Sequence, residues 1–115
     1  MLTIDDIRRY ATTLPEVEEF THFRLPSFRV RGKPFAGVEK GDRTAVFSVS
    51  PEQAAAAVAA DPTAYEEVWR KAATMIFVGL RVDLDRISEQ RMRELVEQAW
   101  RHKAPKRLLA AYDAG

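Results

Sequence analysis

The side chains most able to act on a partner lie in one short stretch, "FRVRGKPF", residues 28–35. Arg29 and Arg31 alternate with apolar residues, so a strand here would bury its apolar side and turn both guanidinium groups outward. Lys33 follows at the expected turn. Such a row could contact the phosphate oxygens of a nucleic acid. The same alternation is also how a sheet covered on one face keeps its other face soluble, and the sequence leaves both interpretations open.

Basic residues gather in two segments, although the net charge is only +1 and the sequence pI about 8.1. Residues 20–49 hold six cations against two acids, and residues 98–112 hold four cations and no acid. A pI this low is unusual for a dedicated nucleic-acid module, but local patches decide partners more than totals do. The predicted phosphate-binding residues are Arg29, Arg31, Lys33, Arg43, Arg101, Lys103, Lys106 and Arg107.

Catalytic and metal-binding patterns are weak. The chain has no cysteine, and its two histidines, His22 and His102, are too far apart in sequence to form a ligand-spaced pair. No serine lies in a nucleophile-elbow pattern, and no glycine-rich phosphate loop is present. We therefore expect no enzyme activity, cofactor or metal site. A small-molecule sensor or enzyme would require a deep pocket that holds His22 or His102 beside a carboxylate.

Aromatic side chains could stack on bases, as they do in proteins that bind single strands. Most of them recur at the spacing of a buried core. Phe23, Trp69 and Trp100 are the three whose exposure would matter most, although burial is the simpler expectation for each.

The order of predicted elements indicates an α+β fold. Thr3 and Ser50 precede the first two helices as N-caps, Pro15 stops the first, and Ser88 caps a third. Gly41 suits the second turn of a strand meander, and the last helix pattern breaks at Pro105. Strands grouped in meanders predict an antiparallel sheet in a two-layer sandwich, with helices on one face. The predicted order is α-β3-α-β2-α(α): a first helix, strands near 27–31, 34–39 and 44–49, a helix at 51–60, strands near 65–70 and 74–82, and a helix from 88 followed by a short terminal one.

Length and composition suggest a single domain over residues 1–115. The absence of cysteine fits a reducing compartment. The first ten residues carry acids and arginines where a signal peptide needs an apolar run, and no stretch reaches the roughly 18 apolar residues of a membrane span. We expect a cytoplasmic protein with no membrane partner.

Four stretches together resemble the MmcQ/YjbR family of small bacterial proteins: "TIDDIRRYATTLPEVEE", "FRVRGKPFAGV", "SPEQAAAAVAADP" and "ISEQRMRELVEQAWRHKAPKRLLAAY". The resemblance covers nearly the whole chain and lies in the order and spacing of these motifs. One stretch departs from it: "WRKAATMIFVGL" replaces a shorter entry, led by glycine or asparagine, to the region of the fourth strand. The resemblance implies a fold comparable with frataxin-like and secretion-chaperone-like domains, and it brings no catalytic residues.

The resemblance also implies a role, DNA binding through a double-wing arrangement. The leading hypothesis is accordingly weak binding to the DNA backbone by the eight cations named above. The alternative is a chaperone-like domain that binds a peptide or protein through a sheet face or edge, without nucleic acid. Either would act as a monomer or a weak homodimer.

The comparison with frataxin raises one further idea, an acidic ridge that binds iron. The sequence favours it little, because acids near a helix N-terminus are explained by the helix dipole and two arginines lie among them. The acids concerned are Asp5, Asp6, Glu16, Glu18 and Glu19.

Overall fold

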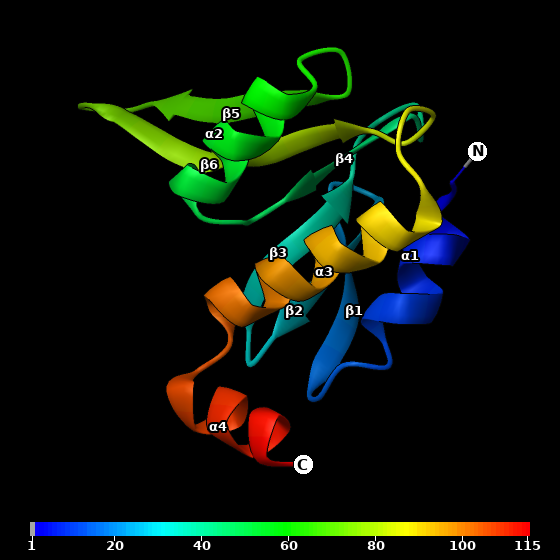
Figure 1. Cartoon of the computed structure of the whole chain (residues 1–115), viewed down its shortest axis with the longest axis vertical. Coiled ribbons are helices and arrows are strands. Elements are labelled where there is room, and N and C mark those ends of the chain that lie inside the picture. Colours follow the sequence, from blue (N-terminus) through cyan, green and yellow to red (C-terminus); the bar gives the residue numbers. More distant parts are fainter. Residues whose placement is uncertain (1) are drawn as a thin grey trace.

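The computed structural model describes residues 2–115, which form one six-stranded antiparallel sheet with helices on one of its faces (Figure 1). The strand order across the sheet is β1-β2-β3-β4-β6-β5. The predicted α+β class, with an antiparallel sheet covered on one side, is confirmed. The strands are β1 (Val17–His22), β2 (Leu25–Val30), β3 (Lys33–Val38), β4 (Thr44–Phe47), β5 (Tyr65–Lys71) and β6 (Met75–Asp83).

The helices begin where the sequence places their caps. Ser50 accepts a hydrogen bond from the Gln53 N–H, and the Gln53 side chain accepts one from the Ser50 N–H. Ser88 accepts from the N–H of Arg91 in the same way. These bonds satisfy N–H groups that a helix leaves without partners. The helices are α1 (Ile4–Ala11), α2 (Pro51–Ala60), α3 (Glu89–Lys103) and α4 (Lys106–Ala114).

The core lies between the sheet and α3, which packs across β2, β3 and β4. Phe28, Phe35 and Phe47 point toward this helix from three adjacent strands and are fully buried. From α3, Trp100 fills the helix side of the core, and its indole N–H donates to the Pro15 carbonyl oxygen at 3.1 Å. Full burial of side chains this large stabilises the fold by roughly 2–3 kcal/mol each. None of the described helices is long and apolar enough to cross a membrane.

The predicted element order is wrong in one place, because a strand that the sequence analysis left out, β1, precedes the meander. β1 pairs with β2 along its whole length, from Val17 opposite Val30 to His22 opposite Leu25. Its side chains are half-buried or exposed, since β1 is the edge of the sheet. A strand with so little burial lacks the apolar alternation by which strands are predicted.

The turn between β2 and β3 begins one residue earlier than the sequence predicted. Arg31 and Gly32 both adopt positive φ, and Val30 pairs with Lys33 across them. This is a two-residue turn of the kind that suits a twisted hairpin. Arg31 therefore lies at the tip of the turn and not on the strand beside Arg29.

The hairpin of β5 and β6 extends beyond the sheet. β4 pairs with β6 only between Thr44–Asp83 and Phe47–Leu80, whereas β5 and β6 stay paired out to Lys71 and Met75. Figure 1 shows this outer half projecting at the upper left. We call residues 68–79 the β5–β6 arm.

Candidate functional site

Two of the predicted phosphate-binding residues are neutralised by a glutamate of β1 and by the glutamate just before that strand. Arg29 Nε lies 2.6 Å from a Glu18 carboxylate oxygen, and the Arg31 guanidinium binds both oxygens of Glu16. The Glu16 carboxylate raises the pKa of Arg31, and the hydrogen bond from Arg31 lowers the pKa of Glu16. Each pair presents a compensated charge to an approaching anion.

Arg101 and Arg43 do not contribute free charge either. Arg101 binds Asp113 of α4 at 2.6 Å and Glu97 at 3.1 Å, and these hydrogen bonds, that of Asp113 first, raise its pKa. Arg43 lies in the turn after β3, at the opposite end of that strand from Lys33, with Asp85 at 3.5 Å. The structure therefore separates Arg43 from the other seven predicted residues.

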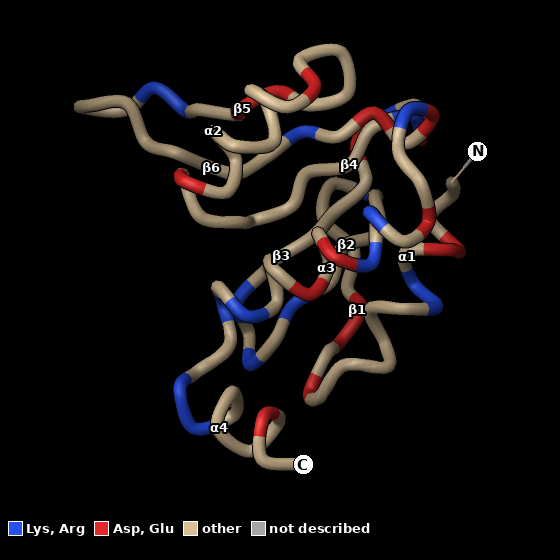
Figure 2. The backbone as a smooth tube through the Cα atoms, viewed as in Figure 1, with Lys and Arg blue, Asp and Glu red and all other residues tan. Residues whose placement is uncertain are grey.

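The four remaining cations lie at one end of the molecule. Figure 2 shows the basic positions of the β2–β3 turn, the end of α3 and the start of α4 at the lower left. A short chain of contacts joins these segments: His102 Nδ1 lies 2.9 Å from the Ser48 carbonyl oxygen, and the Ser48 N–H donates to Phe35 of β3. Within residues 2–115 no ion pair involves any of the four. We call this set the basic end: Lys33, Lys103, Lys106 and Arg107.

The start of α4 adds polarity of the same sign. Pro105 is its N-cap and supplies no side-chain hydrogen bond. In the described part of the chain, the N–H groups of Lys106 and Arg107 have no hydrogen-bond partner, since the first bonds to Pro105 come from Leu108 and Leu109. Unpaired N–H groups at a helix start favour an anion, and here they lie beside three cationic side chains.

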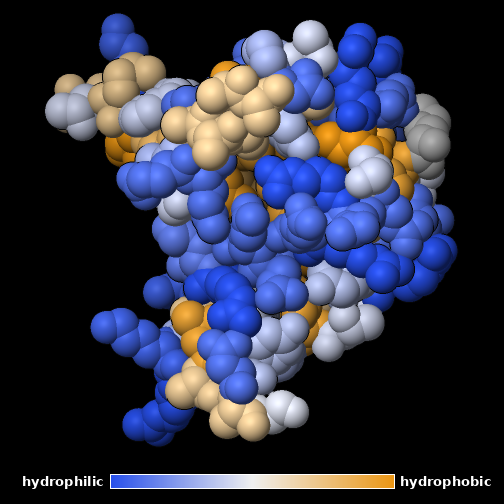
Figure 3. All heavy atoms as spheres, in the orientation of Figure 1, coloured by the Kyte–Doolittle hydropathy of each residue, from blue (hydrophilic) through white to orange (hydrophobic). Residues whose placement is uncertain are grey.

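The exposed apolar residues lie elsewhere, mostly on the β5–β6 arm. Met75 is 57% exposed, Trp69 46%, Val78 40% and Ile76 39%. Apolar colour gathers over the arm and the alanine-rich α2 in Figure 3, whereas polar side chains cover most of the rest of that face. Sequence reasoning identified Trp69 but took the residues of β6 for a buried strand. The departure from the family pattern in this stretch was the available signal.

Phe23 and Trp100, the other two aromatic residues considered for stacking, differ in exposure. Phe23 is 86% exposed in the turn between β1 and β2, next to the His22 ring at 4.5 Å. Trp100 is fully buried and packs edge-on against Tyr112, so it cannot stack on a base.

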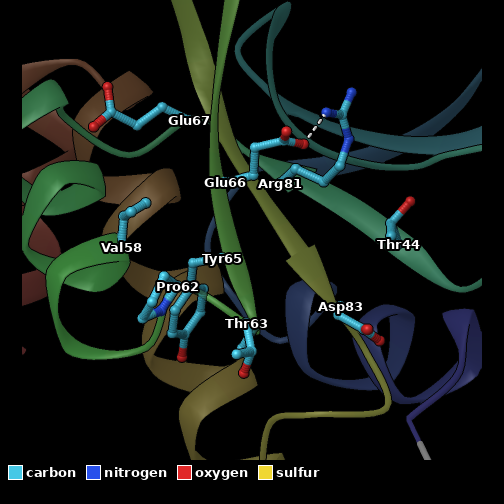
Figure 4. A pocket seen from close by; sticks show the side chains of 10 residues that line it. Thr44, Val58, Pro62, Thr63, Tyr65, Glu66, Glu67, Arg81 and Asp83 are labelled. Carbon is cyan, nitrogen blue, oxygen red and sulfur yellow. Dashed lines mark hydrogen bonds and ion pairs between the residues drawn. The ribbon is translucent and has the colours of Figure 1, made fainter.

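One cavity, of about 410 Å³, is lined mainly by residues of β5, of β6 and of the segment just before β5 (Figure 4). Arg81 in this cavity binds Glu66 at 2.6 Å and also Glu39, the residue after β3, at 2.7 Å. The hydrogen bond from Arg81 lowers the pKa of Glu39, and Glu39 and Glu66 raise that of Arg81. Glu39 is thus held ionised in a salt bridge.

The two histidines lie in different surroundings. His22 lines a second cavity of about 300 Å³ together with Glu39, but the Glu39 oxygens are taken by Arg81 and Thr44. His102 contacts a backbone carbonyl oxygen. Within residues 2–115 no group of three His, Asp or Glu side chains is placed to hold a metal. The acids of the supposed iron ridge bind arginines or helix N–H groups instead, as Glu16, Glu18, Glu19 and Asp6 show.

Comparisons with known proteins agree with this architecture. A family model described as YjbR matches residues 12–102. The fold is also similar to the crystal structure of Deinococcus radiodurans protein DR2400, family-model domain DUF419, with a TM-score of 0.72 and 20% sequence identity over 87% of this chain and 77% of that one. No curated protein matches the sequence significantly. The chain belongs to the YjbR family, as its sequence motifs predicted.

Proposed function

We propose that this protein binds the phosphate backbone of nucleic acid with its basic end. The observation that carries the proposal is the convergence of Lys33, Lys103, Lys106 and Arg107 from three segments, none of them paired with a carboxylate in residues 2–115. The set is half the predicted one. Arg29, Arg31 and Arg101 are compensated by carboxylates, and Arg43 lies at the other end of β3.

Contacts of this kind give weak binding without sequence preference. Each neutralised phosphate releases counterions, so the logarithm of the association constant falls with the logarithm of salt concentration by about 0.9 per contact. Four contacts predict a slope of about 3.6 and a dissociation constant near the nonspecific range of roughly 10⁻⁴–10⁻⁶ M. No described side chain of the basic end is placed in a motif that reads base edges.

Anisotropy titration of a short labelled duplex tests the proposal. Replacing all four cations by alanine should weaken binding about 100-fold at roughly 50 mM salt and remove most of the salt slope. The matched control replaces Arg24, Lys40, Arg70 and Lys71, four other cations that form no ion pair with any described residue, and should leave most of the affinity intact. Equal losses in the two variants, or no binding by the wild type at low salt, would refute the proposal.

A second function, peptide or protein binding, is favoured by a separate observation. The alternative drawn from the sequence was a domain that binds a peptide through a sheet face or edge, and the β5–β6 arm exposes apolar side chains there: Trp69, Met75, Ile76 and Val78. Apolar groups gathered in this way usually mark an interaction surface. The arm lies at the upper left of the molecule and α4 at the bottom (Figure 1), so the two surfaces can act independently.

A further inference from the structure

Both faces of the β5–β6 arm carry apolar side chains. Trp69 and Phe77 lie opposite each other, with ring centroids 5.2 Å apart, on the face of Leu80, whose side chain enters the core, whereas Ile76 lies opposite Arg70 on the other face. A two-stranded ribbon that is apolar on both sides has no core of its own to fill. A strand added at the edge of the arm would cover the apolar side chains of both faces.

The two edges of the arm differ in their protection. The register irregularity of the hairpin lies in β6, where Val78 is the extra residue because Val68 pairs with Gly79 and Trp69 with Phe77. β5 carries Arg70 and Lys71 near its end, and charges are a usual means by which an edge strand avoids pairing with another chain. On the other side, residues 75–78 of β6 read Met-Ile-Phe-Val, with neither charge nor proline. Their pairing to β4 ends at Leu80, so among the described residues no strand covers this edge.

The positive charge of the arm favours an acidic partner. Residues 68–80 contain Arg70 and Lys71 and no acid, and neither cation forms an ion pair within residues 2–115. Arg70 lies opposite Ile76 and Lys71 opposite Met75, so one cation stands on each face beside the apolar residues. A segment that alternates apolar with acidic residues complements both features.

Other occupants fit less well. A second copy joined arm to arm would bring four cations together and no acid. A lipid bilayer would leave the N–H and C=O groups of the free β6 edge without partners in hydrocarbon, at several kcal/mol for each group. Nucleic-acid bases could stack on Trp69, but the aliphatic residues Ile76 and Val78 offer no aromatic face.

We propose that the β5–β6 arm takes up an extended, acidic and apolar segment of a partner protein as an added strand on residues 75–78 of β6. Main-chain hydrogen bonds along the edge hold the segment, and its alternate side chains contact the two faces of the arm. This inference rests on peptide binding, the second function proposed above, and is independent of the basic end.

The test uses the full chain and two labelled seven-residue peptides, one alternating valine with aspartate and one alternating valine with lysine. The aspartate peptide should bind at least about tenfold more tightly. The double variant Arg70→Glu with Lys71→Glu should reverse this preference. The matched control, Arg24→Glu with Lys40→Glu, changes the net charge equally outside both proposed surfaces and should leave the aspartate peptide preferred. Hydrogen exchange should show the amides of residues 75–78 newly protected by the aspartate peptide.

Each outcome decides the matter. Preference for the aspartate peptide with protection at 75–78 supports the strand-addition proposal. If the aspartate peptide binds without protecting residues 75–78, strand addition at this edge is wrong but peptide binding is still supported. If neither peptide binds, both strand addition and peptide binding are wrong. Arm-dependent binding to phosphatidylserine vesicles or to oligothymidine, without binding of the aspartate peptide, would assign the arm to a lipid or nucleic-acid partner instead.

Discussion

Two groups of cations that are equivalent in the sequence have opposite surroundings in the fold. Arg29 and Arg31, on β2 and its turn, face the acidic edge strand β1 and bind its glutamates or the one just before it. Lys103 and Lys106, on either side of Pro105, meet no carboxylate in the described chain. Local charge density therefore identifies candidate phosphate ligands, and the neighbouring strand decides which of them remain available.

The ion pairs of Arg29 and Arg31 also join the edge strand β1 to β2. Cross-strand pairs of opposite charge stabilise an antiparallel pair by roughly 0.2–1 kcal/mol each. The pairs of Glu18 with Arg29 and of Glu16 with Arg31 lie on and just beyond the register of β1 and β2. Their role is to hold β1 in place, which agrees with the structural interpretation of the alternating arginines.

Removing the carboxylate partners of Arg29 and Arg31 should produce the largest change in DNA affinity. In the double variant Glu16→Gln with Glu18→Gln, Arg31 and Arg29 lose their charged partners and become free to contact phosphate. DNA affinity should rise about tenfold in the anisotropy titration, with the salt slope steeper by up to about 1.8. The control Asp42→Asn with Glu52→Gln removes the same charge without releasing an arginine. An equal gain in the control would show that only net charge matters.

The salt bridge between Glu39 and Arg81 should make the free energy of unfolding depend on pH. Glu39 has a pKa below the ordinary 4.5 because of its hydrogen bond with Arg81. Its contribution to folding is therefore complete above pH 4.5 and is lost as pH falls through the lower folded pKa. Glu39→Gln should reduce the free energy of unfolding at pH 7 by about 1 kcal/mol, a figure discounted because both side chains keep contact with solvent.

Urea unfolding at pH 7 and at about pH 3.5 measures this effect. Between these pH values the wild type should lose more stability than the variant, because the variant has no carboxylate at position 39 to protonate. An equal loss in both proteins would show that the salt bridge of Glu39 with Arg81 contributes nothing to folding.

Removing the paired arginines should have the smallest effect on DNA. Arg29→Ala with Arg31→Ala should change the affinity less than about twofold, because both charges are already compensated by Glu18 and Glu16. A loss near tenfold in the same titration would place these arginines back in the interface. Circular dichroism of the variant checks that β1 stays in place.

Most of the fold could be predicted because its signals are local. The capping residues Ser50 and Ser88 and the turn glycines act on their immediate neighbours. β1 was missed because its acids suggest a loop. The signal that reveals it is long-range: Glu16 and Glu18 match Arg31 and Arg29 at the same spacing in reverse order, the pattern of an antiparallel pair.

The site could be predicted only in part, for the same reason. The sequence identified all four residues of the basic end, since clustering is visible in one dimension. It could not show that Asp113 folds back onto Arg101, which depends on the angle between α3 and α4. Nor could it show that β4 ends at Phe47 and leaves one edge of Met75–Val78 without a paired strand among the described residues, which depends on the relative lengths of two strands.

Lysine acetylation with and without duplex DNA tests the central claim most directly. The chain has five lysines, of which Lys33, Lys103 and Lys106 belong to the basic end and Lys40 and Lys71 do not. At low salt, DNA should slow the acetylation of the first three by about threefold or more and leave the other two unchanged. Uniform protection of all five, or strongest protection at Lys71, would contradict the claim that this end of the molecule holds the phosphate backbone.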